Sequence, residues 1–82
     1  MTMYTIKTMP NEADDILKGD KQFVFREAKP QYEVGTNVTF AVVDSKRITP
    51  HPIEDRVYRI TYIERGEPIQ DGILAIGFRP VK

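Results

Sequence analysis

The chain has 82 residues, of which 40% are hydrophobic and 29% charged, values typical of a single small globular domain. It has no cysteine, which excludes disulfides and thiolate metal sites and fits a reducing cytoplasm, where we expect the protein to be located. Twelve Lys and Arg residues balance twelve Asp and Glu residues, so the net charge gives no general attraction to nucleic acid. No apolar run is long enough to span a bilayer, and we expect no contact with a membrane.

Two short strands are predicted in the first third of the chain, at Met3–Lys7 and Gln22–Glu27, because polar and apolar side chains alternate there. In the second of them, Phe23 and Phe25 share one face. We expect these two rings to enter the core, which would direct Arg26 towards a cleft or solvent.

A helix of about nine residues is predicted between these strands. Pro10 suits its first turn, where a missing N–H group costs nothing, and Gly19 can end it in a left-handed conformation. Ile16 and Leu17 lie on one narrow apolar face. A helix this short is not stable alone, so we expect these two side chains to pack on the sheet.

The rest of the chain predicts further strands at Asn37–Asp44, Arg56–Arg65 and Gly72–Arg79. The stretch Ser45–Asp55 lacks a period, and we expect an irregular loop in which His51 is solvated. Several strands are apolar on both faces, and one helix cannot cover them all. We therefore predict an α+β domain over residues 1–82, a curled β-barrel of about five strands with one short helix, whose core contains Phe23, Phe25, Val38, Phe40, Ile60, Leu74 and Ile76.

Basic residues are the main candidates for a binding site. Lys21, Arg26 and Lys29 are close together in the sequence, and Lys7 ends the first strand. They could form an anion or phosphate site, or a solvated strand edge where lysine prevents unwanted strand pairing. Phosphate loops and nucleotide fingerprints are absent, and a single histidine excludes a multi-histidine metal site, so we expect no metal and no cofactor. Two further aromatic residues are candidates for base stacking, Tyr32 and Tyr58.

The stretch around the helix end resembles the ASCH domain, a family named after the activating signal cointegrator and grouped with PUA-like barrels. The resembling pattern is a helix ending in I-L-x-G-x-K, then a strand with arginine and a V-G turn. It comprises Ile16, Leu17, Gly19, Lys21, Arg26, Val34 and Gly35, and extends more weakly to residues 57–63 and 72–77.

The resemblance implies a PUA-like barrel with a cleft that binds RNA, because members of the family are thought to bind RNA there. It assigns nucleic-acid binding to Lys21 and Arg26, with Lys7 and Lys29 adding positive charge. Some bacterial relatives are acetylcytidine amidohydrolases, so an alternative is a small amidohydrolase acting on a modified nucleoside, with Lys21 as the reactive group. Val24 occupies the position of the motif's glutamate, which favours a binding module without catalysis. A third alternative is a protein-interaction module with an exposed strand edge.

Overall fold

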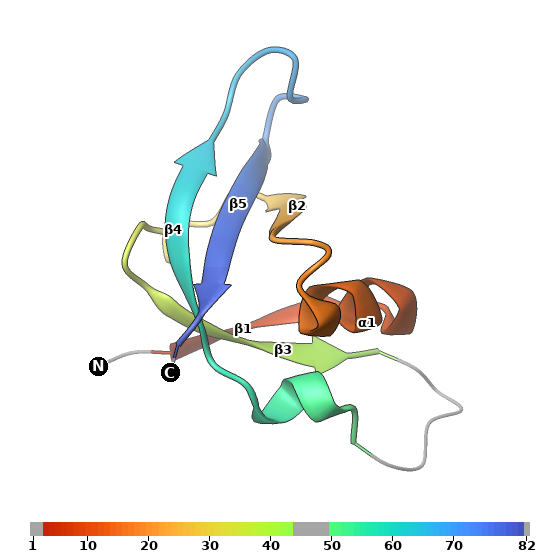
Figure 1. Ribbon diagram of the computed structural model, residues 1–82. Helices are drawn as coiled ribbons and strands as arrows, with labels where there is room; N and C mark the ends of the chain where they lie inside the picture. Colours follow the sequence, from red (N-terminus) through yellow and green to blue (C-terminus); the bar gives the residue numbers. More distant parts are fainter. Residues whose placement is uncertain (1–2, 44–49, 82) are drawn as a thin grey trace.

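A computed structural model describes residues 3–43 and 50–81 and contains the predicted helix and all five predicted strands (Figure 1). The elements are β1 (Met3–Thr8), α1 (Pro10–Lys18), β2 (Phe23–Glu27), β3 (Asn37–Val42), the 3-10 helix η1 (Pro52–Asp55), β4 (Tyr58–Glu64) and β5 (Ile73–Pro80). The end of the predicted third strand, Asp44, and the first part of the predicted loop, residues 45–49, lie outside the described residues.

Helix α1 forms for the reasons that the sequence predicts. Pro10 occupies its first turn, and Gly19 follows its last residue with a φ of 87°. The next residue, Asp20, donates its backbone N–H to the carbonyl of Asp15 at 3.0 Å, which closes the helix end. Ile16 is buried, and Leu17 is partly buried against the core. The predicted packing of the helix is therefore confirmed.

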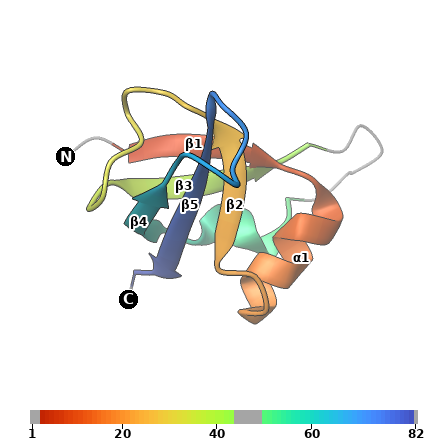
Figure 2. The ribbon, with the colours of Figure 1, turned by 90° about the horizontal axis from the view of Figure 1, so that it is seen from above.

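The five strands form one mixed sheet in the order β1-β3-β4-β5-β2. The β1–β3 pair is parallel, and the other three pairs are antiparallel. Seen from above, β2 and β5 pass across β1 and β3, with α1 beside them (Figure 2). The α+β class is thus confirmed, but the sheet is open: β1 and β2 are its two edges, and no strand pairing joins them in the described part of the chain. A closed barrel is not confirmed.

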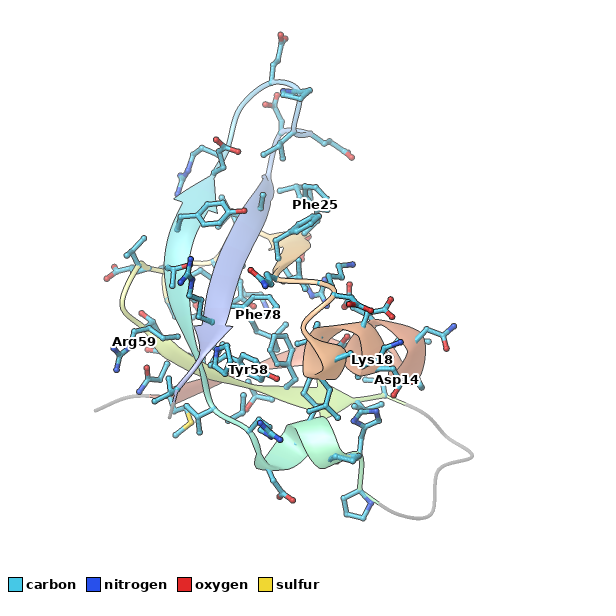
Figure 3. All side chains as sticks on the ribbon, viewed as in Figure 1. Asp14, Lys18, Phe25, Tyr58, Arg59 and Phe78 are labelled. Atoms are coloured by element: carbon cyan, nitrogen blue, oxygen red, sulfur yellow. The ribbon has the colours of Figure 1, made fainter. Side chains whose placement is uncertain are left out.

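The core is centred on three aromatic rings. Phe40, Tyr58 and Phe78 come from three different strands, and their ring centroids lie 5.2 to 5.4 Å apart, in tilted or edge-to-face contacts. Tyr58 and Phe78 point into the interior beside these strands (Figure 3). Most of the predicted core is confirmed, namely Val38, Phe40, Ile60, Leu74 and Ile76. Tyr32 and Tyr58 are also buried, so they cannot serve as stacking surfaces.

The prediction for β2 was wrong, because the strand presents its other face to the core. Val24 is fully buried opposite Ile76, whereas the side chains of Phe23 and Phe25 are on the outer face, with 40% and 52% of their surface exposed. Arg26 lies on the same side as Val24 and forms an ion pair with the carboxylate of Glu12 on α1. A partly buried arginine needs such a partner, so the ion pair favours this orientation over the burial of two phenylalanines.

The prediction that His51 is solvated was also wrong. Its Nδ1 accepts a hydrogen bond from the backbone N–H of Ile53 at 3.1 Å, which caps η1. Its Nε2 lies 2.6 Å from Oδ1 of Asp14 on α1. Only 13% of the His51 side chain is exposed. His51 therefore joins η1 to α1.

Candidate functional site

A narrow groove separates the two edge strands of the open sheet. Its volume is about 270 Å³, and we call it the seam groove. Three of the four predicted basic residues line it, Lys7 from β1, Arg26 from β2 and Lys29 from the segment after β2. Glu27 and Tyr32 complete much of the wall. The open edge of the sheet thus gathers positive charge that the sequence distributes over more than twenty residues.

Arg26 is the residue that spans the seam. Its Nη2 donates to the backbone carbonyl of Lys7 on β1 at 2.9 Å and to Oε1 of Glu12 on α1 at 2.6 Å. Its Nη1 donates to the carbonyl of Phe25 at 2.6 Å. The guanidinium therefore connects both sheet edges and the helix, and these hydrogen bonds fix its position.

Glu12 is the centre of this polar cluster. Lys21 Nζ lies 2.8 Å from its Oε2, and the hydroxyl of Thr8 donates to Oε1 at 2.6 Å. Burial acts to raise the pKa of Glu12, but hydrogen bonds from Lys21, Thr8 and Arg26, with the positive charge of Arg26, outweigh it and lower the pKa to about 2. Glu12 is therefore ionised at neutral pH and neutralises part of the positive charge beside the seam.

The structure divides the four predicted cations into two kinds. Lys7 and Lys29 are exposed, and neither has an ion pair within residues 3–43 and 50–81. Arg26 and Lys21 are both paired with Glu12, and Lys21 lies on the far side of that carboxylate, outside the lining of the seam groove. Of the three cations that line the groove, Arg26 is thus held in place by its ion pair, and Lys7 and Lys29 are free to move.

Sequence reasoning missed Glu12 and Thr8. A signal was available, since the two residues are four apart at the start of a helix that follows a strand. In the sequence alone, Glu12 is also explained as a negative charge that suits the start of a helix. What the sequence does not show is that β2 brings Arg26 to the same place, because that contact depends on which face of β2 enters the core.

The carboxylate of this cluster is poorly suited to act as a general base. Glu12 provides the carboxylate that Val24 does not, but a group with a pKa of about 2 is a weak base at neutral pH. The buried hydroxyl of Thr8 already donates to that carboxylate. Within the described ranges, no group of three or more His, Asp or Glu side chains could hold a metal ion.

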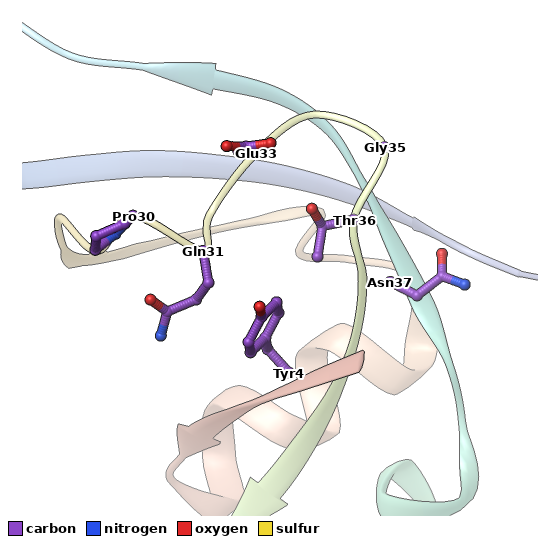
Figure 4. A pocket seen from close by; sticks show the side chains of 7 residues that line it. All are labelled: Tyr4, Pro30, Gln31, Glu33, Gly35, Thr36 and Asn37. Carbon is purple, nitrogen blue, oxygen red and sulfur yellow. The ribbon is translucent and has the colours of Figure 1, made fainter. Parts of the chain in front are cut away.

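A second, larger hollow of about 650 Å³ lies between the start of β1 and the segment that leads to β3 (Figure 4). Tyr4, Gln31, Glu33 and Thr36 are among its lining residues, and the side chains of Tyr4 and Gln31 extend into the same space. Residues 29–33 contribute to the lining of both this hollow and the seam groove, so the two depressions adjoin along this segment. We call this hollow the amide pocket.

No protein-family model matches the chain, and no curated protein is significantly similar to it. No helix in the described parts of the chain is long and apolar enough to cross a membrane.

Proposed function

We infer that the domain binds RNA or a nucleotide, with phosphate groups held in the seam groove. The observation that carries this proposal is the position of Lys7, Arg26 and Lys29 around one depression at the open edge of the sheet. The resemblance to the ASCH family supports the same ligand class. In this proposal the chain is an ASCH-like, PUA-like module. The edge strands β1 and β2 are connected by the Arg26 side chain and not by backbone pairing.

The seam groove has the electrostatic character that phosphate binding requires. The cations Lys7, Lys21, Arg26 and Lys29 are opposed by two carboxylates, Glu12 and Glu27, which leaves a local charge of +2. Arg26 is fixed before any ligand arrives, so its binding entails little loss of side-chain entropy. Lys7 and Lys29 are free to move onto a phosphate.

The amide pocket supports a nucleotide rather than a simple anion. Gln31 offers both hydrogen-bond donors and an acceptor, Thr36 offers a hydroxyl, and Tyr4 offers a ring face. Unstacked RNA bases are recognised by such edge hydrogen bonds and by stacking on aromatic rings. With a phosphate in the seam groove, an adjacent base could reach this pocket along residues 29–33, which line both depressions.

Fluorescence anisotropy with a labelled eight-nucleotide uridine RNA, at increasing salt, tests the proposal. Three phosphate contacts predict that log K falls with log salt with a slope of about −2. Lys7→Gln and Lys29→Gln should each weaken binding and make this slope shallower by about 0.7. Both residues are exposed and unpaired among the described residues, so the fold should not change.

Lys18→Gln is the matched control, because Lys18 is an exposed lysine at the end of α1, outside the seam groove. It should leave both affinity and slope nearly unchanged. Equal losses for Lys7→Gln, Lys29→Gln and Lys18→Gln would show only a general effect of charge, and absence of salt-sensitive binding by the wild type would refute the proposal.

A further inference from the structure

The outer face of β2, β5 and β4 carries three exposed aromatic side chains that the core does not use. Phe23 and Phe25 are on β2, and Tyr62 on β4 is 48% exposed. The rings of Phe23 and Phe25 meet edge to face, with centroids 5.6 Å apart. Phe25 points away from the interior beside β5 (Figure 3). Exposed aromatic residues gathered on one sheet face indicate a binding surface rather than scattered surface residues.

The strand between these aromatic residues, β5, carries two small residues on this face, Ala75 and Gly77. Gly77 of β5 pairs with Phe23 on one side and with Tyr62 on the other, and Ala75 pairs with Phe25. The ring of Tyr62 lies over Gly77 so closely that a Cβ atom added there would collide with it. Ala75 and the three aromatic side chains line a hollow of about 330 Å³, which continues along the hairpin after β4.

Positive charges occupy one end of this face. Arg59 and Arg79 are direct partners in the β4–β5 register, and both are exposed. Like charges opposite each other destabilise a sheet, and no ion pair compensates either of them within the described residues. Arg79 is two residues beyond Gly77, or about 7 Å along the strand. Near Phe23, the ammonium of Lys21 lies 5.8 Å from the ring centroid.

We propose that this outer face, defined by Phe23, Phe25, Tyr62, Arg59 and Arg79, binds single-stranded RNA by stacking its bases on the aromatic rings while the arginines hold phosphates. For the class of ligand, this rests on the proposed function. The residues differ from those of the seam groove, so the two surfaces can be tested separately. Aromatic rings combined with positive charge are the combination by which proteins bind single strands with little sequence preference.

The arrangement of charge favours RNA over an apolar peptide. An apolar peptide on this face would bury Arg59 and Arg79 without counter-charges, whereas RNA phosphates would neutralise them. At the other end of the face, beside the hollow, the carboxylates of Glu64 and Glu67 outnumber the single cation Arg65. They would repel phosphate there, so the RNA backbone should cross the face at the arginine end.

Anisotropy with three labelled ligands provides the test: a uridine octamer, an abasic octamer with the same backbone, and a duplex RNA. Phe23→Leu and Phe25→Leu keep an apolar side chain but remove the stacking ring, and each should weaken octamer binding by about fivefold or more. Phe25→Trp should retain it. Because the abasic backbone has no bases to stack, neither leucine variant should change its binding, and the duplex should bind more weakly than the octamer.

Val34→Ala is the control for a general effect of surface hydrophobicity, because Val34 is exposed and lies outside this face. Lys7→Gln and Lys29→Gln separate the two proposals, since they affect the seam groove alone. Octamer binding that depends on the two lysines but not on Phe23 and Phe25 would overturn this inference and leave the proposed function intact. A concentration-dependent dimer abolished by Phe25→Leu, with octamer binding unaffected, would identify a second copy as the occupant and overturn it too.

Discussion

Replacing Glu12 by glutamine should destabilise the domain in a way that depends on pH. The pKa of Glu12 is about 2 in the folded chain, against an ordinary value of 4.5, and this difference corresponds to about 3 kcal/mol when the carboxylate is ionised in both states. Glutamine keeps the shape and one acceptor but leaves Lys21 and Arg26 without a counter-charge. Those cations can recover some hydration, so we expect a loss of about 1–3 kcal/mol at pH 7.

The sign of the pH dependence follows from the lowered pKa. The contribution of Glu12 is complete above pH 4.5 and is lost as the pH falls through 2, and more than half of it, about 2 kcal/mol, should be gone at pH 3. Urea denaturation of the wild type and Glu12→Gln at pH 7, 5 and 3 measures this. The gap between the two should persist at pH 5 and narrow at pH 3.

Asp15→Asn is the matched control, because Asp15 is on the same helix but is exposed, with only a 3.8 Å contact to Lys18. It should change the free energy of unfolding by less than about 0.5 kcal/mol. If Glu12→Gln were as stable as the wild type at pH 7, or if the gap between them were constant from pH 7 to 3, the account of this cluster would be wrong.

Substitutions at other positions test the fold. Phe40→Ala should cost about 3–5 kcal/mol in urea denaturation, whereas Phe23→Ala on the outer face should cost less than about 1.5 kcal/mol; similar losses would contradict the assigned faces. Gly77→Ala should destabilise the wild type but cost clearly less in a Tyr62→Ala background, since the collision involves that ring, and additive effects in this double-mutant cycle would argue against it. His51→Ala should lose about 1 kcal/mol through the η1 cap, and calorimetry that finds no change would refute that role.

Patterns among neighbouring residues predicted the positions of the helix and the five strands. The alternation in β5, the proline at the start of α1 and the glycine at its end depend on neighbouring residues, and the structure agrees with each of them. The inward face of β2 could not be found in this way. Its alternation offers two phenylalanines on one side and Val24 with Arg26 on the other, and hydrophobicity alone favours the phenylalanines. In the structure, the side with Val24 and Arg26 faces inward, and Arg26 is paired with Glu12, which is 14 residues away in the sequence.

The same long-range contact limited the prediction of the site. The sequence indicated Lys7, Arg26 and Lys29, and the structure brings them to one groove. The sequence does not indicate that Arg59 on β4 and Arg79 on β5 share a face with exposed aromatic residues. That arrangement depends on strand register, which includes an irregularity between Ile60 and Tyr62 that a strict two-residue alternation does not predict.

The most direct test of the central claim, that RNA phosphates bind in the seam groove, is a titration of the ¹⁵N-labelled domain with the uridine octamer, followed by NMR. We expect the largest, saturable shifts at the backbone amides of Lys7, Arg26 and Lys29, decreasing as salt is added. If RNA also binds the outer face, a second group of shifts should appear on β2 and β5. Shifts that avoid the seam groove, or no shifts at an RNA concentration well above that of the protein, would contradict the claim.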